Sequence, residues 1–327
     1  MAGLAMRAIR IEAYGGPDVL RVVELPTPRP GPGQVLVTVE AAGVNFIDTY
    51  QRTGFYPLHL PAVLGQEAAG RVAGLGAGVT DWKEGDRVAF ASVMGAYADS
   101  VVIAADRLVP VPASVTTRVA SAAMLQGMTA QYLVTDTFPL QSGHTCLIHA
   151  AAGGVGLLLV QVAKLKGATV IGTVSTAEKA QLARDAGADH VVNYAEEDFE
   201  AAVKRLTNGR GVQVVYDSVG KATFMQSLNA LAARGMLVTF GQSSGAVPPF
   251  DPLLLSQRGS LFLTRPVLGH YIGTREALLS RANETLGWVA EGRLKVRIDS
   301  EFPLTAVADA HRKLESRGST GKLLLIP

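Results

Sequence analysis

The stretch His149-Ala-Ala-Ala-Gly-Gly-Val-Gly156 decides the fold, because a short apolar run precedes it and a helix-like run, residues 155–166, follows it. Ala151, Gly153 and Gly156 take the three fixed places of the pattern G-x-G-x-x-G. Glycines at such a turn let the main chain approach a pyrophosphate, and the N-terminus of the next helix offers unpaired N–H groups to the phosphates. The turn therefore predicts a dinucleotide site at the start of a Rossmann domain.

Further strand-like runs follow this turn, and helical segments separate them. The six predicted strands are residues 146–150, 169–174, 191–193, 212–217, 235–240 and 260–264. Strands that alternate with helices in this way are typical of a doubly wound parallel sheet. We therefore expect an α/β fold in which the glycine-rich turn follows the first strand of one six-stranded sheet.

The chain on either side of this region has a different pattern. Before about residue 125, short β-branched runs such as 35–39, 88–90 and 101–103 are separated by Gly and Pro, which predicts a mostly β domain. After about residue 266 we expect helices near 276–290 and 306–316 and a last strand at 322–326. The predicted division is a catalytic domain at 1–127, a Rossmann domain at 128–267 and a segment at 268–327 that returns to the catalytic domain.

Composition and charge exclude several classes of protein. Of the 327 residues, 48% are hydrophobic and 18% charged, which is too apolar for a disordered chain. Thirty Lys and Arg against 28 Asp and Glu give a net charge of +2, so we expect no nucleic-acid partner. The single cysteine, Cys146, excludes an internal disulfide, and the N-terminus has no apolar signal core. Together these two features predict a cytoplasmic location. The uncharged stretch 137–163 is interrupted by Pro139 and by glycines, so we expect no membrane span there.

The end of the predicted second strand indicates which dinucleotide is bound. A Rossmann fold that prefers NAD usually carries Asp or Glu there, whereas this strand ends with Thr173 and Ser175, and Lys179 follows one turn into the next helix. A hydroxyl and an ammonium favour a 2′-phosphate, so we predict NADPH. The alternative is that Lys179 is a solvated helix residue. Ser175 and Glu178 also predict a capping box at this helix.

Motifs along essentially the whole chain resemble one family. They are NFIDTY (Asn45 to Tyr50), GQEAAG (Gly65 to Gly70), AAAGGVG (Ala150 to Gly156), VYDSVG (Val215 to Gly220), FGQSSG (Phe240 to Gly245) and LTRP (Leu263 to Pro266). The sequence resembles the medium-chain dehydrogenase/reductase superfamily and, within it, the zinc-independent NADPH:quinone oxidoreductases of the zeta-crystallin-like branch. This resemblance implies a GroES-like β domain, a Rossmann domain, a homodimer, and one-electron or two-electron reduction of a quinone by NADPH.

Two residues argue against a metal site. Zinc alcohol dehydrogenases of the superfamily have Cys where Asn45 stands and His where Gln66 stands. Amide side chains are poor zinc ligands compared with thiolate and imidazole, so we predict no metal. Without a Lewis acid to activate an alcohol, we expect hydride donation into an acceptor that is already electrophilic.

The turn and the resemblance together predict the site residues. Those expected to bind the cofactor are Asn45, Ile47, Asp48, Tyr50, Thr129, Ala152, Gly153, Gly154, Val155, Gly156, Thr173, Ser175, Lys179, Tyr194, Ser218, Phe240, Gly241, Ser243, Leu263, Arg265 and Arg317. Tyr50, Tyr56 and Gln66 are candidates for positioning the acceptor, and each is equally open to being a packing or cofactor contact. We interpret Asp48 as a helix cap rather than a base.

Two other functions stay open. An enoyl or 2-alkenal reductase would use the same hydride on the same zinc-free fold. A non-catalytic NADPH-binding protein of the crystallin or RNA-binding type is the other, although the balanced charge argues against RNA. We expect His149 and Cys146 to be buried residues of the first Rossmann strand and not catalytic groups.

Overall fold

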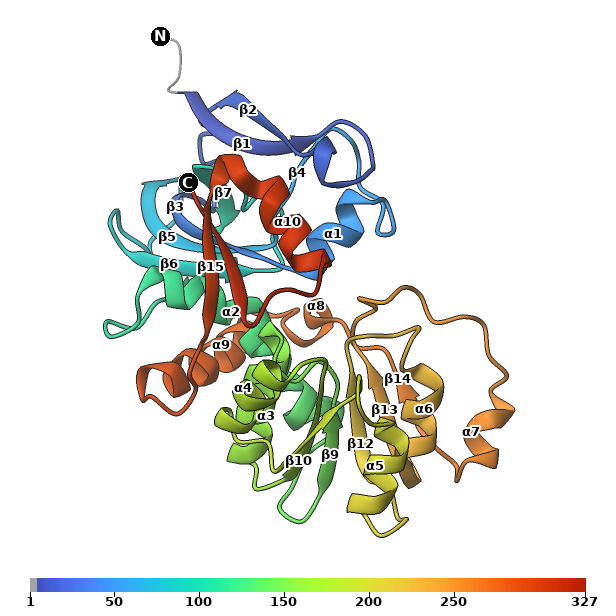
Figure 1. Cartoon of the computed structure of the whole chain (residues 1–327). Coiled ribbons are helices and arrows are strands. Elements are labelled where there is room, and N and C mark those ends of the chain that lie inside the picture. The colour runs from blue at the N-terminus through green and yellow to red at the C-terminus, as the bar shows by residue number, and fades with distance from the viewer. Residues whose placement is uncertain (1–4) are drawn as a thin grey trace. The chain divides into compact units, whose positions relative to one another are not determined.

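The computed structural model describes residues 5–327 and divides the chain into two compact units (Figure 1). The first unit contains the chain up to Met128 together with Ile272–Pro327, and the second contains Thr129–Tyr271. The α/β fold class is confirmed: the first unit is mostly β, and the second is built on one six-stranded sheet.

The first unit is built on two sheets. One has the order β15-β16-β3-β5-β6-β8 with β7 also paired to β3, and the other has the order β2-β1-β4. The strands are β1 (Ala5–Ile11), β2 (Arg21–Pro26), β3 (Gln34–Val44), β4 (Ala62–Val63), β5 (Glu67–Leu75), β6 (Arg87–Ala91), β7 (Ser100–Ala104), β8 (Val109–Pro110), β15 (Ile298–Pro303) and β16 (Lys322–Ile326). The helices are η1 (Pro17–Val19), α1 (Phe46–Arg52), η2 (Ala105–Arg107), the larger part of α2 (Thr117–Tyr132), α9 (Arg275–Ala290), η4 (Leu304–Ala306) and α10 (Val307–Glu315).

The end of the chain completes the core of the first unit. Strand β16 pairs antiparallel with β3, and Leu323 lies opposite Val44. Alternate residues of β3 are buried (Val35, Val37 and Val39), as expected for a strand with one face on a core. Helix α10 packs beside α1 (Figure 1), so residues more than 250 positions apart in the sequence become neighbours.

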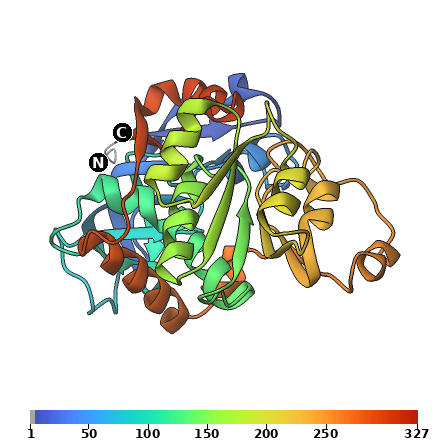
Figure 2. The same ribbon diagram turned by 60° about the horizontal axis from the view of Figure 1, so that its bottom comes forward.

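The second unit is one sheet of six strands in the order β11-β10-β9-β12-β13-β14, and all of its pairs are parallel. Its strands are β9 (Thr145–Ile148), β10 (Thr169–Val174), β11 (His190–Asn193), β12 (Val212–Asp217), β13 (Leu231–Thr239) and β14 (Phe262–Thr264). Its helices are η3 (Leu133–Thr137), α3 (Gly154–Leu165), α4 (Ala177–Asp185), α5 (Phe199–Leu206), α6 (Phe224–Ala230), α7 (Leu253–Gln257) and α8 (Leu268–Tyr271). Figure 2 shows α3 and α4, in yellow-green, as one pair and α5 and α6, in yellow to orange, as another.

The predicted strands of this sheet are confirmed, with shifted ends at some of them. The first strand ends at Ile148 rather than Ala150, because Ala150 has a positive φ of 51° and already belongs to the turn. Cys146, Leu147 and Ile148 are all buried, as is usual for a parallel sheet covered by helices on both faces. No helix within residues 5–327 has the length and apolar character that a membrane crossing requires.

The predicted capping box at α4 is wrong. The N-cap is Thr176, one residue after Ser175, and its hydroxyl accepts a hydrogen bond from the main-chain N–H of Lys179 at 3.2 Å. Thr176 is the residue with extended backbone angles at this helix start, and the cap must be non-helical for its side chain to reach the first turn. Ser175 therefore keeps its hydroxyl for other contacts.

Candidate functional site

The turn between β9 and α3 folds tightly against the start of the helix. The carbonyl of Ala150 accepts the N–H of Gly153 at 2.8 Å, and the carbonyl of Gly153 accepts the N–H of Leu157 at 2.9 Å. A Cβ at Gly156 would lie 2.9 Å from the Cα of Ala151, so only glycine fits where the helix passes the turn. The first N–H groups of α3 have no acceptor within their own helix, and they can bind a phosphate. This one turn brings together Ala152, Gly153, Gly154, Val155 and Gly156.

The end of β10 supplies a hydroxyl and an ammonium at the same edge of the sheet, because β10 runs parallel to β9. The Nζ of Lys179 lies 3.4 Å from the Oγ of Ser175, and both side chains are half-buried. Thr173 is directed differently: it is buried, and its hydroxyl lies 2.9 Å from the Nδ1 of His149. Of the three residues predicted here, Ser175 and Lys179 form the polar pair, whereas the Thr173 side chain contacts the interior.

His149 and Cys146 are buried, as expected. His149 lies between the hydroxyls of Thr173 and Ser227, each at 2.9 Å, and burial lowers its pKa, so the ring is neutral. Burial raises the pKa of Cys146 to about 12, which makes the thiol a poor nucleophile.

The loops after β12, β13 and β14 bring together four further predicted residues, Ser218, Gly241, Ser243 and Arg265. The carbonyl of Ser218 accepts the N–H of Ser243 at 3.1 Å, and a Cβ at Gly241 would lie 2.7 Å from the same carbonyl. The guanidinium of Arg265 donates to the carbonyl of Gly241 at 3.4 Å and to the side chain of Gln242 at 3.2 Å. These residues therefore form one tightly bonded loop region.

The remaining predicted residues of the second unit lie nearby in the fold or in its core. Phe240 follows β13, Tyr194 follows β11 and is 47% exposed, Leu263 packs on the core of the Rossmann unit, and Thr129 is buried in α2. Phe240 and Tyr194 thus follow the carboxyl ends of parallel strands, which is where Rossmann folds bind their ligands.

In the first unit, Asp48 is the third residue of α1 and completes the capping box whose N-cap is Asn45. Its Oδ2 accepts the main-chain N–H of Asn45 at 2.8 Å and the hydroxyl of Tyr97 at 2.6 Å, which confirms its interpretation as a helix cap. Burial raises the pKa of Asp48 to about 7, although the hydrogen bonds from Tyr97 and Asn45 oppose that shift.

The side chain of Asn45 is held inside a buried polar cluster. Its Nδ2 donates to Glu67 at 2.7 Å, and its Oδ1 accepts the ammonium of Lys322 at 2.8 Å. Lys322 also forms an ion pair with Glu67, whose second oxygen accepts the N–H of Leu125 at 2.7 Å. Glu67 and Lys322 are not among the residues predicted from the sequence. The available signal was a charged residue at the start of each strand, although β5 carries a second charge, the exposed Arg71.

An aromatic cluster is formed by α1 and the segment that follows it. The rings of Tyr50 and Tyr56 are 5.5 Å apart and nearly perpendicular, and Phe55 packs on both while remaining 49% exposed. The structure therefore brings together two of the three predicted acceptor residues. The third, Gln66, is buried, and its amide contacts the sulfur of Met94 at 3.0 Å.

Two other predicted cofactor residues belong to the first unit. Ile47 is half-buried on α1, next to the cap. Arg317 is exposed just after α10 and has a positive φ of 59°. The predicted role of Arg317 as a cofactor contact rests on the resemblance.

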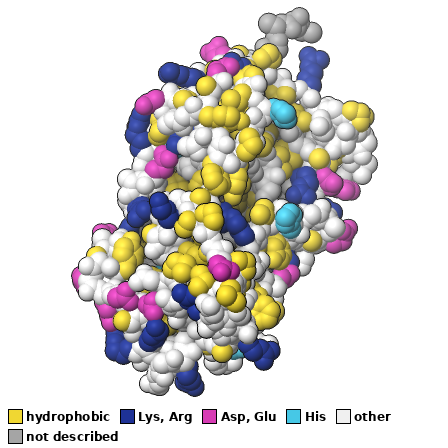
Figure 3. Space-filling view, turned by 90° about the vertical axis from the view of Figure 1, so that its right-hand side faces the viewer, with side chains coloured by type: hydrophobic (Ala, Val, Ile, Leu, Met, Phe, Trp, Pro, Cys, Tyr) yellow, Lys and Arg dark blue, Asp and Glu magenta, His cyan; other side chains and the backbone are white. Residues whose placement is uncertain are grey.

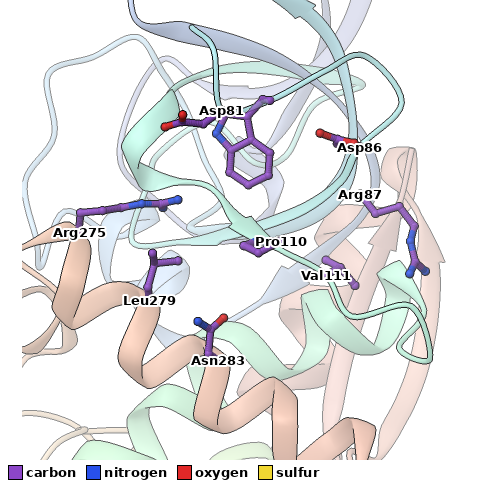
Figure 4. A pocket seen from close by; sticks show the side chains of 9 residues that line it. Asp81, Asp86, Arg87, Pro110, Val111, Arg275, Leu279 and Asn283 are labelled. Carbon is purple, nitrogen blue, oxygen red and sulfur yellow. The ribbon is translucent and has the colours of Figure 1, made fainter.

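A separate hollow of about 510 Å³ lies on the first unit between α9 and the loops near β6 and β8 (Figure 4). Its two guanidinium groups are already bonded: Arg87 donates to the carbonyls of Pro112 and Val115, and Arg275 donates to that of Asp106. None of the predicted site residues lines it.

Across residues 5–327, no group of three or more His, Cys, Asp and Glu side chains is arranged to hold a metal ion. On the face drawn in Figure 3, basic and acidic side chains are interspersed, in keeping with a net charge of +2.

Comparison with known proteins gives matches over almost the whole chain. The model for the alcohol dehydrogenase GroES-like domain matches residues 31–113, and that for zinc-binding dehydrogenases matches residues 154–284. A quinone oxidoreductase of Pseudomonas aeruginosa is 46% identical over 98% of this chain and 99% of its own. The 2-haloacrylate reductase of a Burkholderia species is 42% identical over 99% of both. The crystal structure of Escherichia coli quinone oxidoreductase complexed with NADPH matches with a TM-score of 0.96 at 46% identity, over 98% of this chain and 100% of that one.

Proposed function

This chain belongs to the quinone oxidoreductase family of the medium-chain dehydrogenase/reductase superfamily, and we propose that it uses NADPH to reduce a quinone. The proposal rests on one observation at the carboxyl ends of β9 and β10, which are parallel neighbours in the sheet. The glycine-rich start of α3 follows β9, and the Ser175–Lys179 pair follows β10. When bound, NADPH supplies a hydride from its nicotinamide ring.

The residues of the second unit fit a phosphorylated dinucleotide. The main chain from Gly153 to Gly156 would hold the pyrophosphate, because a side chain at Gly156 would fill the space that the turn needs. Ser175 and Lys179 would bind a 2′-phosphate through a hydroxyl and an ammonium, and no carboxylate stands among residues 173–176 to repel it. The loop residues around Ser218, Gly241 and Arg265 would contact the rest of the cofactor.

Residues of the first unit would position the acceptor. Tyr50 and Tyr56 combine an apolar ring with a hydroxyl, which suits a planar ring that carries carbonyl oxygens. The oxyanion formed on a quinone is delocalised into its ring, so little acid catalysis is required. Asp48 is not assigned as a base, because its Oδ2 already accepts two hydrogen bonds, one of them in the capping box of α1.

The direct test is NADPH consumption by the purified protein with 1,4-benzoquinone and with 9,10-phenanthrenequinone. We expect turnover with at least one of them, and faster turnover with NADPH than with NADH at equal subsaturating concentration. Tight NADPH binding without turnover of any quinone would refute the proposal and favour a non-catalytic binding protein.

Reduction of an activated alkene is a second candidate. It is favoured by the 2-haloacrylate reductase that is 42% identical over 99% of this chain. Such a reaction requires a proton donor directed at the carbon next to the carbonyl, in addition to the hydride. A panel of 2-alkenals and 2-haloacrylate, assayed beside the quinones, separates the two candidates.

The proposal includes a homodimer and a cytoplasmic location. Strand β14 is an end strand of the six-stranded sheet, and Phe262 on it is 54% exposed, which suits burial against a second copy. Light scattering should give twice the mass of one chain, and the mass of one chain would contradict the dimer. The single buried Cys146 suits a reducing compartment, and cell fractionation tests that location.

A further inference from the structure

The ion pair between Lys322 and Glu67 is buried completely, with 1% and 0% of the side chains exposed. Every polar atom of the pair has a protein partner. Lys322 also donates to Asn45, and the two oxygens of Glu67 accept the Asn45 amide and the main-chain N–H of Leu125. Removing two charges from water is costly, and a buried ion pair is often no more stabilising than apolar residues of the same volume. Stability alone is therefore a weak reason for the pair.

The contacts of the pair converge on the elements that carry the proposed acceptor residues. Asn45 opens α1, which carries Tyr50. Glu67 is the first residue of β5 and follows Gln66 directly. Leu125 lies in the middle of α2, and Lys322 begins β16. One ion pair thus joins two helices and two strands. Of these elements, α1 carries Tyr50, and β5 begins directly after Gln66.

Strand β3 packs tightly against the Lys322–Glu67 pair at Gly43. A Cβ at Gly43 would lie 2.6 Å from the carboxyl carbon of Glu67 and 2.6 Å from the Cε of Lys322. Gly43 does not have a positive φ, so the crowding and not the backbone conformation is what requires glycine there. The pair is therefore held in one geometry by β3.

We propose that Lys322 and Glu67 are positioning residues for the acceptor: they fix α1, which carries Tyr50 of the aromatic cluster, relative to the start of β5. The proposal rests on the proposed quinone reductase function. It predicts that displacing the pair impairs acceptor binding more than it impairs NADPH binding.

The first test moves the pair without removing a charge. Gly43→Ala pushes a methyl group against Glu67 and Lys322, and Gly74→Ala on the adjacent strand β5 is the matched control, since its nearest neighbour would be at 3.7 Å. We expect Gly43→Ala to raise the KM for the quinone about tenfold, as for the loss of one good hydrogen bond, and to leave the NADPH Kd within about twofold. Gly74→Ala should leave both unchanged. Equal quinone KM values in the two variants would overturn the proposal.

The second test separates positioning from stability. Lys322→Met and Glu67→Leu each leave one buried charge without its partner, so each should lower the Tm strongly, and the double variant should recover part of that loss. A positioning role predicts that the quinone KM stays raised in the double variant. A quinone KM that returns to the wild-type value together with the Tm would show a structural role only. If the single variants do not fold, the Gly43→Ala comparison decides.

Assays of the wild-type protein distinguish failure of the proposed function from failure of the positioning role. Absence of turnover with any quinone in the wild-type protein refutes the proposed function. Wild-type turnover with an unaffected Gly43→Ala variant refutes only the positioning role.

Discussion

The ammonium of Lys179 lies 3.4 Å from the hydroxyl of Ser175, at the carboxyl end of β10 and beside the glycine-rich turn that follows the neighbouring strand β9. This pair is the structural basis for the choice of cofactor. Lys179→Ala should raise the Kd for NADPH about 10- to 100-fold, as for the loss of a charge-assisted hydrogen bond, and leave the Kd for NADH nearly unchanged. Lys204→Ala, which removes an exposed lysine of α5, is the control. Fluorescence titration with both nucleotides measures the effect, and equal losses for the two would contradict the phosphate role.

The turn itself makes a different prediction, because it binds the part that NADPH and NADH share. Gly156→Ala would place a methyl group 2.9 Å from the main chain of Ala151. Overpacking of this kind costs about 1 to 3 kcal/mol, and we expect weaker binding of both nucleotides by similar factors. Gly287→Ala in α9 is the matched control, since nothing lies within 4 Å of its Cβ and alanine suits a helix interior. Selective loss of NADPH alone would argue against a pyrophosphate site at this turn.

A buried histidine gives the first unit a defined pH dependence. Arg52 lies with Nη1 3.1 Å from the Nδ1 of His311, and burial together with the Arg52 charge lowers the pKa of His311 to about 3. Because the folded-state pKa lies below the unfolded value of about 6.5, the unfolded chain binds the proton first as the pH falls. The contribution of His311 to stability is therefore present above about pH 6.5 and is lost progressively toward pH 3.

Urea unfolding at two pH values tests this account. Between pH 7 and pH 5, the free energy of unfolding of the wild type should fall by about 2 kcal/mol more than that of His311→Gln, whatever the absolute stability of the variant. His190→Gln, at an exposed histidine of β11, is the control and should follow the wild type. Parallel pH profiles for the wild type and His311→Gln would show that His311 is not held neutral.

The acceptor residues predict a kinetic signature. Tyr50→Phe and Tyr56→Phe keep the packed rings, 5.5 Å apart, and remove only the hydroxyls. We expect the variant that loses an acceptor hydrogen bond to show a quinone KM raised about fivefold, with the NADPH Kd unchanged. Steady-state kinetics at saturating NADPH provides the measurement. If neither variant changes the quinone KM, both tyrosines are packing residues.

The sequence predicts most of the fold because the relevant patterns are local. Apolar runs and the turns between them correctly locate β10, β12 and β16, and the glycine-rich turn locates the start of α3. The cap of α4 was placed one residue early, because Ser175 and Thr176 are both good caps and only the backbone angles distinguish them. In the same way, the pattern does not show that the Thr173 hydroxyl bonds His149.

The candidate site is less predictable because its contacts join distant parts of the chain. Lys322 and Glu67 are 255 positions apart, and Arg52 and His311 are 259 apart. Neither pair has a local pattern that names its partner. Lys322 is visible in the sequence as the one charge of an apolar strand, whereas Glu67, Arg52 and His311 stand near other polar residues. The partner of each is known only once β16 lies beside β3 and α10 beside α1.

The most direct test of the central claim is a comparison of kcat/KM for a quinone and for an activated alkene, both with saturating NADPH. We expect 9,10-phenanthrenequinone or 1,4-benzoquinone to be reduced at least about tenfold more efficiently than any 2-alkenal or 2-haloacrylate, a difference of about 1.4 kcal/mol in transition-state stabilisation. A higher kcat/KM for the alkene than for every quinone would contradict it.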